Sequence, residues 1–436
     1  MPIGSMSSRA LLAAAAVAAA SLLRAPAMAQ NFIASNDKPV PGQPVWKPSF
    51  KFPHAPPPAN DPKPWLAIDP TQKPADYANA VLAYFMEGQN TKTWRVQDNP
   101  VRKWYHMPWM HAGTLGREVI HGLTRERNAS PGTLAPTQKK CPETWSIGFF
   151  NPTAGYQLWK IWNDGNSNPD FSAATMPEGS VVVKLLFSQA DPKEVPYLKG
   201  SPTFTANVAT PAGGDTGCVS LGETRRAKGT VHLVQVDFAV KDKMHAPKTN
   251  WVFGTFAWRR EAPGNNAWKK LVPVGVTWGS DPELSDDQAA SGQKPVESIV
   301  LDKFQFTRDF GRGGRMNGPL DNPISSCMSC HQTAQMPNSA NLTAGNNDKW
   351  DTAKCWFRDL SSSEPFGDPP TATSCGKNAG KQSLDFSLQL QVGWRNWAME
   401  HKPMTPALTA RAAGAPNEPS IQPMMIDNQI SQPIMR

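Results

Sequence analysis

The chain has 436 residues, a formal net charge of +8 and six cysteines. Such a length exceeds what one simple core needs, so we expect two domains or one domain with large insertions. The positive charge is modest and is spread along the chain, which argues against nucleic-acid binding. After the N-terminal segment no stretch is apolar over the roughly 20 residues that a membrane span requires, so we expect no transmembrane anchor after processing.

Residues 1–29 have the features of a secretory signal peptide. Arg9 gives a positive start, residues 10–23 are apolar and rich in alanine, and Ala27-Met28-Ala29 offers the small-x-small pattern of a cleavage site. We therefore predict export to the periplasm, with a mature chain that begins near Gln30.

Residues 30–75 are rich in proline, which neither pairs steadily in a sheet nor continues a helix. We predict an extended arm for this segment. The arm carries four large aromatic residues, which indicates that it packs against the body of the protein: Trp46, Phe50, Phe52 and Trp65.

Residues 76–300 are predicted to form a β-rich domain that begins with helices. The spacing of apolar residues predicts a helix over 76–87, and we expect a second, short helix over 117–123. From about residue 141 the pattern changes, and strands are predicted over 180–187, 231–240, 251–258 and 271–278. Because no helical pattern separates most of these strands, an antiparallel sheet or sandwich is the economical arrangement.

Cys327-Met328-Ser329-Cys330-His331 is the most informative motif of the chain. Two thiols three positions apart, with a histidine directly after the second, form the attachment pattern of a c-type haem. Each thiol adds across one vinyl group of the porphyrin, and the histidine is then held under the iron as its proximal ligand. The motif predicts one covalent haem c per chain, held by Cys327 and Cys330, with His331 as the metal ligand. The competing interpretation is a chance match, with the two cysteines as a disulfide or as free thiols.

Residues 301–436 are predicted to be the haem c-binding region. A glycine- and proline-rich loop precedes the motif, another loop follows it, and a final helix is expected over 383–400 with Ser383 as its cap. The predicted fold class is therefore α+β, with a β-rich antiparallel sheet body and a mainly helical and loop C-terminal haem-binding region.

Four cysteines remain outside the motif, and an even remainder in an exported chain indicates two disulfides. Proximity in sequence favours the pairs Cys141–Cys218 and Cys355–Cys375. The loop closed by the second pair corresponds to roughly 3 kcal/mol of stabilisation on the chain-entropy model. The alternative for all four is that they are buried free thiols.

The sixth ligand of the iron decides the function, because a six-coordinate iron transfers electrons whereas an open site binds small molecules. Met404 is the best-placed methionine for an electron carrier, and Met399 lies on the predicted final helix. Three histidines in and after the aromatic stretch over 104–111 are alternative distal ligands, namely His106, His111 and His121. A further alternative is an open iron site without a sixth ligand.

The Cys327–His331 motif resembles that of the c-type cytochromes, and this resemblance implies one haem per chain. In class I cytochromes c the motif lies near the start of a small all-helical domain, after a helix, with the methionine ligand downstream. The predicted helix over 383–400 matches their terminal helix, whereas the glycine-rich run before Cys327 departs from their opening helix.

A second resemblance is to the β-sheet haem proteins of the cytochrome c′-beta kind and their hydroxylamine-oxidising relatives. In these proteins a sheet precedes a C-x-x-C-H motif that lies towards the C-terminus. Residues 177–184, 236–243 and 251–254 resemble their strand pattern. In some of these relatives a lysine is cross-linked to the porphyrin, but the sequence does not place Lys184 in that role.

We predict a periplasmic monohaem c-type cytochrome that carries electrons to or from a redox partner protein. The alternative is a five-coordinate haem c enzyme or gas-binding protein that acts on peroxide, nitric oxide or hydroxylamine. A third hypothesis treats the sheet as a binding module in which the haem is only structural. The sequence has no nucleophile elbow, phosphate loop or zinc-spaced cysteine set, so no catalytic side chain is assigned.

Overall fold

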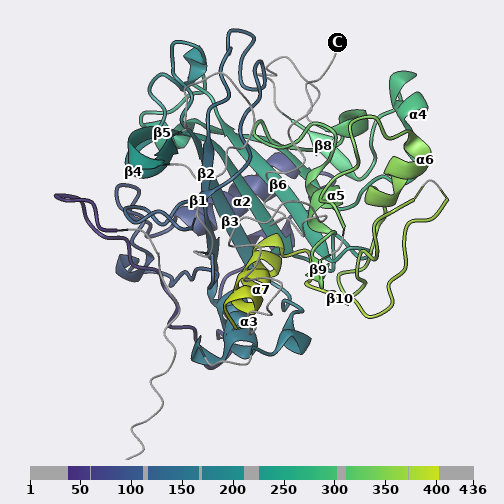
Figure 1. The fold of residues 1–436 in the computed structure, drawn as a ribbon, viewed down its shortest axis with the longest axis horizontal. Helices are drawn as coiled ribbons and strands as arrows, with labels where there is room; N and C mark the ends of the chain where they lie inside the picture. The colour runs from purple at the N-terminus through teal and green to yellow at the C-terminus, as the bar shows by residue number, and fades with distance from the viewer. Residues whose placement is uncertain are drawn as a thin grey trace, which may run out of the picture.

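The computed structural model describes residues 38–58, 60–110, 116–165, 169–210, 225–301, 311–338, 340–371 and 373–401. One large antiparallel sheet forms the body, and helices and long loops cover both of its faces (Figure 1). This confirms the predicted α+β class with a β-rich antiparallel body. Within the described ranges, no helix has both the length and the apolar character to cross a bilayer.

The main sheet has the strand order β1-β2-β3-β5-β6-β7-β8, and β4 pairs with β5 beside this path. The strands predicted over 180–187, 231–240, 251–258 and 271–278 correspond to β3, β5, β6 and β7. The bounds are β1 Thr124–Arg125, β2 Thr144–Phe150, β3 Val181–Ser188, β4 Thr203–Thr210, β5 Arg225–Lys241, β6 Trp251–Trp258, β7 Leu271–Thr277 and β8 Ser298–Val300. A separate two-stranded ribbon pairs β9 (Gln335–Met336) with β10 (Gln382–Ser383).

The α-helices are α2 Pro74–Met86, α3 Pro152–Trp162, α4 Asp286–Ala290, α5 Cys327–His331, α6 Trp350–Ala353 and α7 Leu388–His401. Short 3-10 turns occur at Pro64–Ala67, Val96–Asp98, Asn163–Gly165, Phe171–Ala173, Pro196–Leu198, Ala267–Lys270, Arg312–Gly314 and Lys354–Trp356. The helix predicted over 76–87 is α2, which starts at a proline and ends before Gly88, a glycine with a φ of 72°.

Two predicted helices need correction, and one further helix was not predicted. Residues 117–123 form a turn and not a helix, because Gly122 has a φ of 71° and the Glu118 carboxylate accepts the N–H groups of the turn. The final helix starts at Leu388, since Ser383 is paired in β10. Helix α3 lies between β2 and β3, where only strands were expected, although Asn151 as N-cap and a proline after it are a recognisable start signal.

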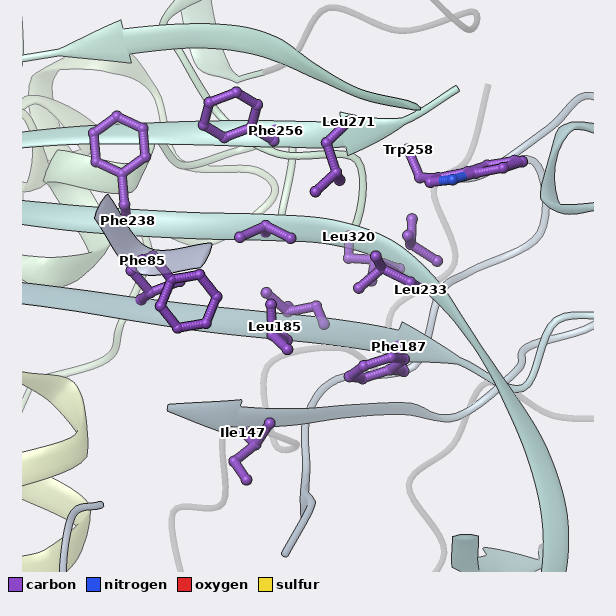
Figure 2. Close-up of a cluster of buried hydrophobic side chains, with 14 of the residues drawn as sticks. Phe85, Ile147, Leu185, Phe187, Leu233, Phe238, Phe256, Trp258, Leu271 and Leu320 are labelled. Atoms are coloured by element: carbon purple, nitrogen blue, oxygen red, sulfur yellow. The ribbon is translucent and has the colours of Figure 1, made fainter. Parts of the chain in front are cut away.

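The first face of the sheet carries the larger hydrophobic core. Side chains alternate between the two faces of a strand, so the odd-numbered residues of β3 point to this side. Figure 2 shows Leu185 and Phe187 of β3 beside Phe238 and Phe256, with Phe85 of α2 packed against the same cluster. Burial of these rings and aliphatic chains fixes the register of the strands, because a slip by one residue would expose them.

The second face of the sheet carries a separate core that includes α3 and α7. Figure 1 shows α7 in front of the strands and α2 behind them. Phe150 of β2, Trp251 and Phe253 of β6, and Leu390 of α7 belong to this core. The motif helix α5 lies on the same side, because Met328 is buried within this cluster.

The proline-rich arm packs against the body as predicted, since Trp46, Phe52 and Trp65 are buried. The predicted Cys355–Cys375 disulfide is confirmed, with an S–S distance of 2.07 Å. It closes a loop over a third, small hydrophobic cluster that includes Trp356. The other predicted bridge, Cys141–Cys218, depends on Cys218, which lies outside the described residues.

Candidate haem-binding site

The motif helix α5 is encoded by its own residues. The Ser326 hydroxyl accepts the backbone N–H of Ser329 at 3.1 Å, and the Ser329 hydroxyl accepts the backbone N–H of Ser326 at 2.8 Å. This reciprocal pair of hydrogen bonds is a capping box, with Ser326 as the N-cap and Cys327 as the first residue of the helix. Positions i, i+3 and i+4 of a helix share one face, so Cys327, Cys330 and His331 are presented together.

All three of these residues line one cavity between the second face of the sheet and the segments around α5 and α7. With the open solvent at its mouth counted, the space between these residues is about 1550 Å³. Its lining is mainly apolar and includes Phe150, Val182, Trp251, Phe253, Leu320 and Phe386.

His331 has the tautomer that a metal ligand needs. Its Nδ1 lies 2.9 Å from the backbone carbonyl oxygen of Phe386, and a carbonyl can only accept, so Nδ1 carries the proton. Nε2 therefore keeps a free lone pair, which is the ligating atom in this arrangement. Burial lowers the pKa of His331 to about 4, and the contact with Phe386 opposes this only in part. The imidazole is thus neutral at physiological pH.

The two motif thiols are free and are not joined to each other. Burial raises the pKa of Cys330 to about 12 and that of Cys327 well above its ordinary value, with Asp321 adding to both effects. Both groups are therefore protonated at neutral pH and are weak nucleophiles towards oxidants. The disulfide alternative for this pair is not what the structure contains.

A polar wall of the cavity is formed by Glu126 of the segment after β1, Lys184 of β3 and Asp237 of β5. Lys184 and Asp237 are directly opposite each other in the β3–β5 register, and Lys184 Nζ lies 2.8 Å from a Glu126 oxygen. Asp237 accepts hydrogen bonds from Gln235 at 2.7 Å and from Thr255 at 2.8 Å. This wall places ionisable groups inside the same cavity as the motif.

The charges of this wall are perturbed by their surroundings. Burial raises the pKa of Asp237 to about 8, and the neighbouring Asp321 carboxylate adds to the rise. Burial works against the charge of Lys184, but the adjacent Glu126 outweighs it and raises the pKa of the lysine. A carboxyl group that titrates near neutral pH in a cavity is a candidate for proton transfer.

Most of the sixth-ligand candidates do not reach the cavity. His106 is fully buried on the other side of the sheet, against Trp46 and Phe149, with Nδ1 donating to the Gly148 carbonyl at 2.9 Å. Met399 is 52% exposed on α7. His121 packs on Phe204, with Nε2 3.1 Å from the Thr205 carbonyl oxygen. Met404 and His111 lie outside the described residues.

Two methionines that the sequence did not single out do line the cavity, Met110 and Met176. Met176 is buried, and its backbone N–H donates to Asp385 at 2.5 Å. Asp237 and Glu126 were also missed. For Asp237 a signal existed, because Gln235 and Asp237 place polar groups at alternate positions of the otherwise apolar run 233–240 within β5. The methionines carry no comparable signal.

Comparisons of the chain with protein-family models, with curated proteins and with solved structures found no match. The identity of the group that this cavity could hold must therefore be inferred from the chemistry of its residues. Two thiols and a neutral imidazole with a free Nε2 face one large, mainly apolar cavity, and these groups fit the attachment of a haem c. Cys327, Cys330 and His331 would hold it.

Proposed function

We propose that the protein is an exported monohaem c-type cytochrome that transfers electrons in the periplasm to or from a partner protein. The observation that carries this proposal is the hydrogen bond between His331 Nδ1 and the Phe386 carbonyl, in the cavity that also contains both motif thiols. This bond leaves the Nε2 lone pair of His331 free to bind a metal, and His331 is the histidine that the motif assigns as the proximal ligand. A haem iron bound there would supply a one-electron redox centre.

The surroundings of the motif support this proposal. Apolar rings from β6 line the His331 side of the cavity, and the ring centres of Phe253 and His331 are 4.7 Å apart. A low-dielectric pocket and a fixed imidazole both limit reorganisation when charge moves at a bound metal. The cavity opens to solvent on one side, which gives a partner protein access.

The test is expression of the full chain in a host with haem-attachment machinery, followed by intact-mass measurement and optical spectra. We expect the mass of one haem to be added to the processed chain. Cys327→Ser together with Cys330→Ser should abolish the covalent addition, and His331→Ala should alter the spectrum. His54→Ala is the matched control, because His54 is exposed and pairs with Asp164 at the surface. A colourless wild-type protein with the mass of the bare polypeptide would contradict the proposal.

A second function is favoured by the polar wall, namely binding or conversion of a small molecule at an open iron. Buried ionisable groups are costly and a site that only carries electrons does not need them, yet Lys184, Glu126 and Asp237 gather where such a molecule would lie. Spectra of the reduced protein with and without carbon monoxide separate the two functions. A low-spin spectrum that the gas does not move supports the carrier, and a high-spin spectrum that shifts supports the open site.

A further inference from the structure

Lys241 and Asp385 form an ion pair at the edge of the cavity, and their side chains are 0% and 1% exposed. Lys241 Nζ lies 2.6 Å from Asp385 Oδ1. The same carboxylate accepts the indole N–H of Trp251 at 2.8 Å and the backbone N–H of Met176 at 2.5 Å. Taking two charges fully out of water is unfavourable compared with an apolar pair of the same shape, so stability alone does not account for this pair.

The backbone at Asp385 is in an uncommon conformation. Asp385 has a φ of 51° and Phe386 has a φ of 62°, and both values lie in the left-handed region. Bulky side chains rarely adopt this region, because Cβ approaches the following carbonyl oxygen. The bonds from Lys241, Trp251 and Met176 hold the Asp385 side chain from three directions. They thereby keep the next residue, Phe386, in a conformation that the free chain avoids.

The result of this conformation is the position of the Phe386 carbonyl, which accepts the Nδ1 proton of His331 at 2.9 Å. Lys241 and Asp385 themselves make no hydrogen bond to His331 among the bonds of the described residues. They act on it through one backbone group. A backbone carbonyl that accepts one ring N–H of a metal-binding histidine fixes the orientation of the ring and raises the basicity of its other nitrogen.

We propose that the Lys241–Asp385 pair is a positioning element for His331, which holds the Phe386 carbonyl in place and so tunes the bond between His331 and its metal. The effect on a metal bond rests on the proposed function. The effect on the histidine ring does not, because it exists in the chain without haem. The variants Lys241→Met and Asp385→Asn remove one charge each and keep the approximate shape of the side chain.

The first measurement uses the full chain without haem and follows solvent exchange of the His331 Nδ1 proton by NMR. We expect exchange to be faster by about tenfold or more in Lys241→Met and in Asp385→Asn. Arg102→Met is the matched control. Arg102 is a buried cation with its own carboxylate, Glu87 at 3.2 Å, and it bonds to the Tyr84 carbonyl of α2 behind the sheet. Exchange should be unchanged in this variant, although it also loses a buried cation and the ion pair that this cation makes with the half-exposed Glu87.

The second measurement is the reduction potential of the haem-loaded protein. A less basic imidazole stabilises the oxidised iron less, so the potential should rise in both variants. Each tenfold loss of preference for the oxidised state corresponds to about 59 mV for one electron. The double variant Lys241→Met/Asp385→Asn leaves no unpaired charge, so it should regain stability relative to either single variant. It should keep the fast exchange and the raised potential, which separates positioning from a merely structural role.

This inference would be overturned if the two single variants showed the same exchange rate and the same reduction potential as the wild type and Arg102→Met. A double variant that restores both the stability and the potential would also overturn it. If no haem attaches to the wild-type protein, the proposed function fails, while the exchange measurement on the haem-free chain still decides whether Lys241 and Asp385 position His331.

Discussion

The buried side chain of His106 predicts how the stability of the protein depends on pH. Burial lowers the pKa of His106 to about 3, with the nearby Arg117 cation adding to the effect. The unfolded chain takes up this proton near the ordinary pKa of 6.5, whereas the folded protein takes it up only near pH 3. Between these values the unfolded state binds more protons, so the stability that the neutral imidazole contributes is lost as the pH falls.

The magnitude follows from the same two values. At pH 4 the His106 contribution to the free energy of unfolding should be lower than at pH 7 by about 3 kcal/mol. The variant His106→Asn removes the titration and keeps an N–H that can donate to the Gly148 carbonyl. It should cost stability at neutral pH through the lost ring contacts. Its stability should then fall less than that of the wild type on acidification, by the same 3 kcal/mol or so.

The assay is urea unfolding at pH 7 and pH 4 for the wild type, for His106→Asn and for His54→Asn, whose histidine is exposed. The control should follow the wild type. The optical spectrum of the haem-loaded His106→Asn variant should also match the wild type, because His106 does not line the cavity. An identical acid dependence in wild type and His106→Asn would refute the reasoning on burial. A changed haem spectrum would refute the placement of His106.

Three further outcomes are expected. Replacing Cys355 and Cys375 by alanine should lower the free energy of unfolding by about 3 kcal/mol in urea titrations and leave the haem spectrum unchanged. If the protein is a carrier, Met110→Leu with Met176→Leu should convert a low-spin spectrum into one that responds to carbon monoxide; an unchanged spectrum excludes both as ligands. In the folded protein Asp237 keeps its proton up to about pH 8, whereas the unfolded chain loses it near 3.8. Stability should therefore fall as the pH rises between these values, and Asp237→Asn should flatten that fall in unfolding curves at pH 5 and pH 8.

The sequence predicted the parts of the fold that short-range patterns determine. β3, β5, β6 and β7 were recognisable from their apolar runs, because β6 is buried along its whole length and most residues of β3, of β7 and of the second half of β5 are buried. The pairing of Cys355 with Cys375 followed from their short separation. The spacing of the motif was also sufficient to place Cys327, Cys330 and His331 on one helical face.

The rest of the site depends on tertiary contacts that leave no local pattern. The acceptor for His331 is a backbone carbonyl, and every residue has one, so no side chain marks Phe386. The polar wall requires the register of Lys184 against Asp237, which a sequence does not give. The turn at residues 117–123 was mistaken for a helix because Gly122 and the carboxylate of Glu118 stabilise a compact turn that apolar spacing alone does not distinguish from a helix.

The partner of the motif histidine lies 55 residues further along the chain. If the chain is exported and receives a haem as proposed, Cys327 and Cys330 would leave the membrane before Phe386, and an attachment enzyme could reach the thiols before the segment around Phe386 packs beside them. A chain shortened to end before residue 382 should still be modified covalently, but its histidine would lack the Phe386 acceptor. On this proposal, covalent attachment at Cys327 and Cys330 would precede the packing of the segment that supplies the His331 acceptor.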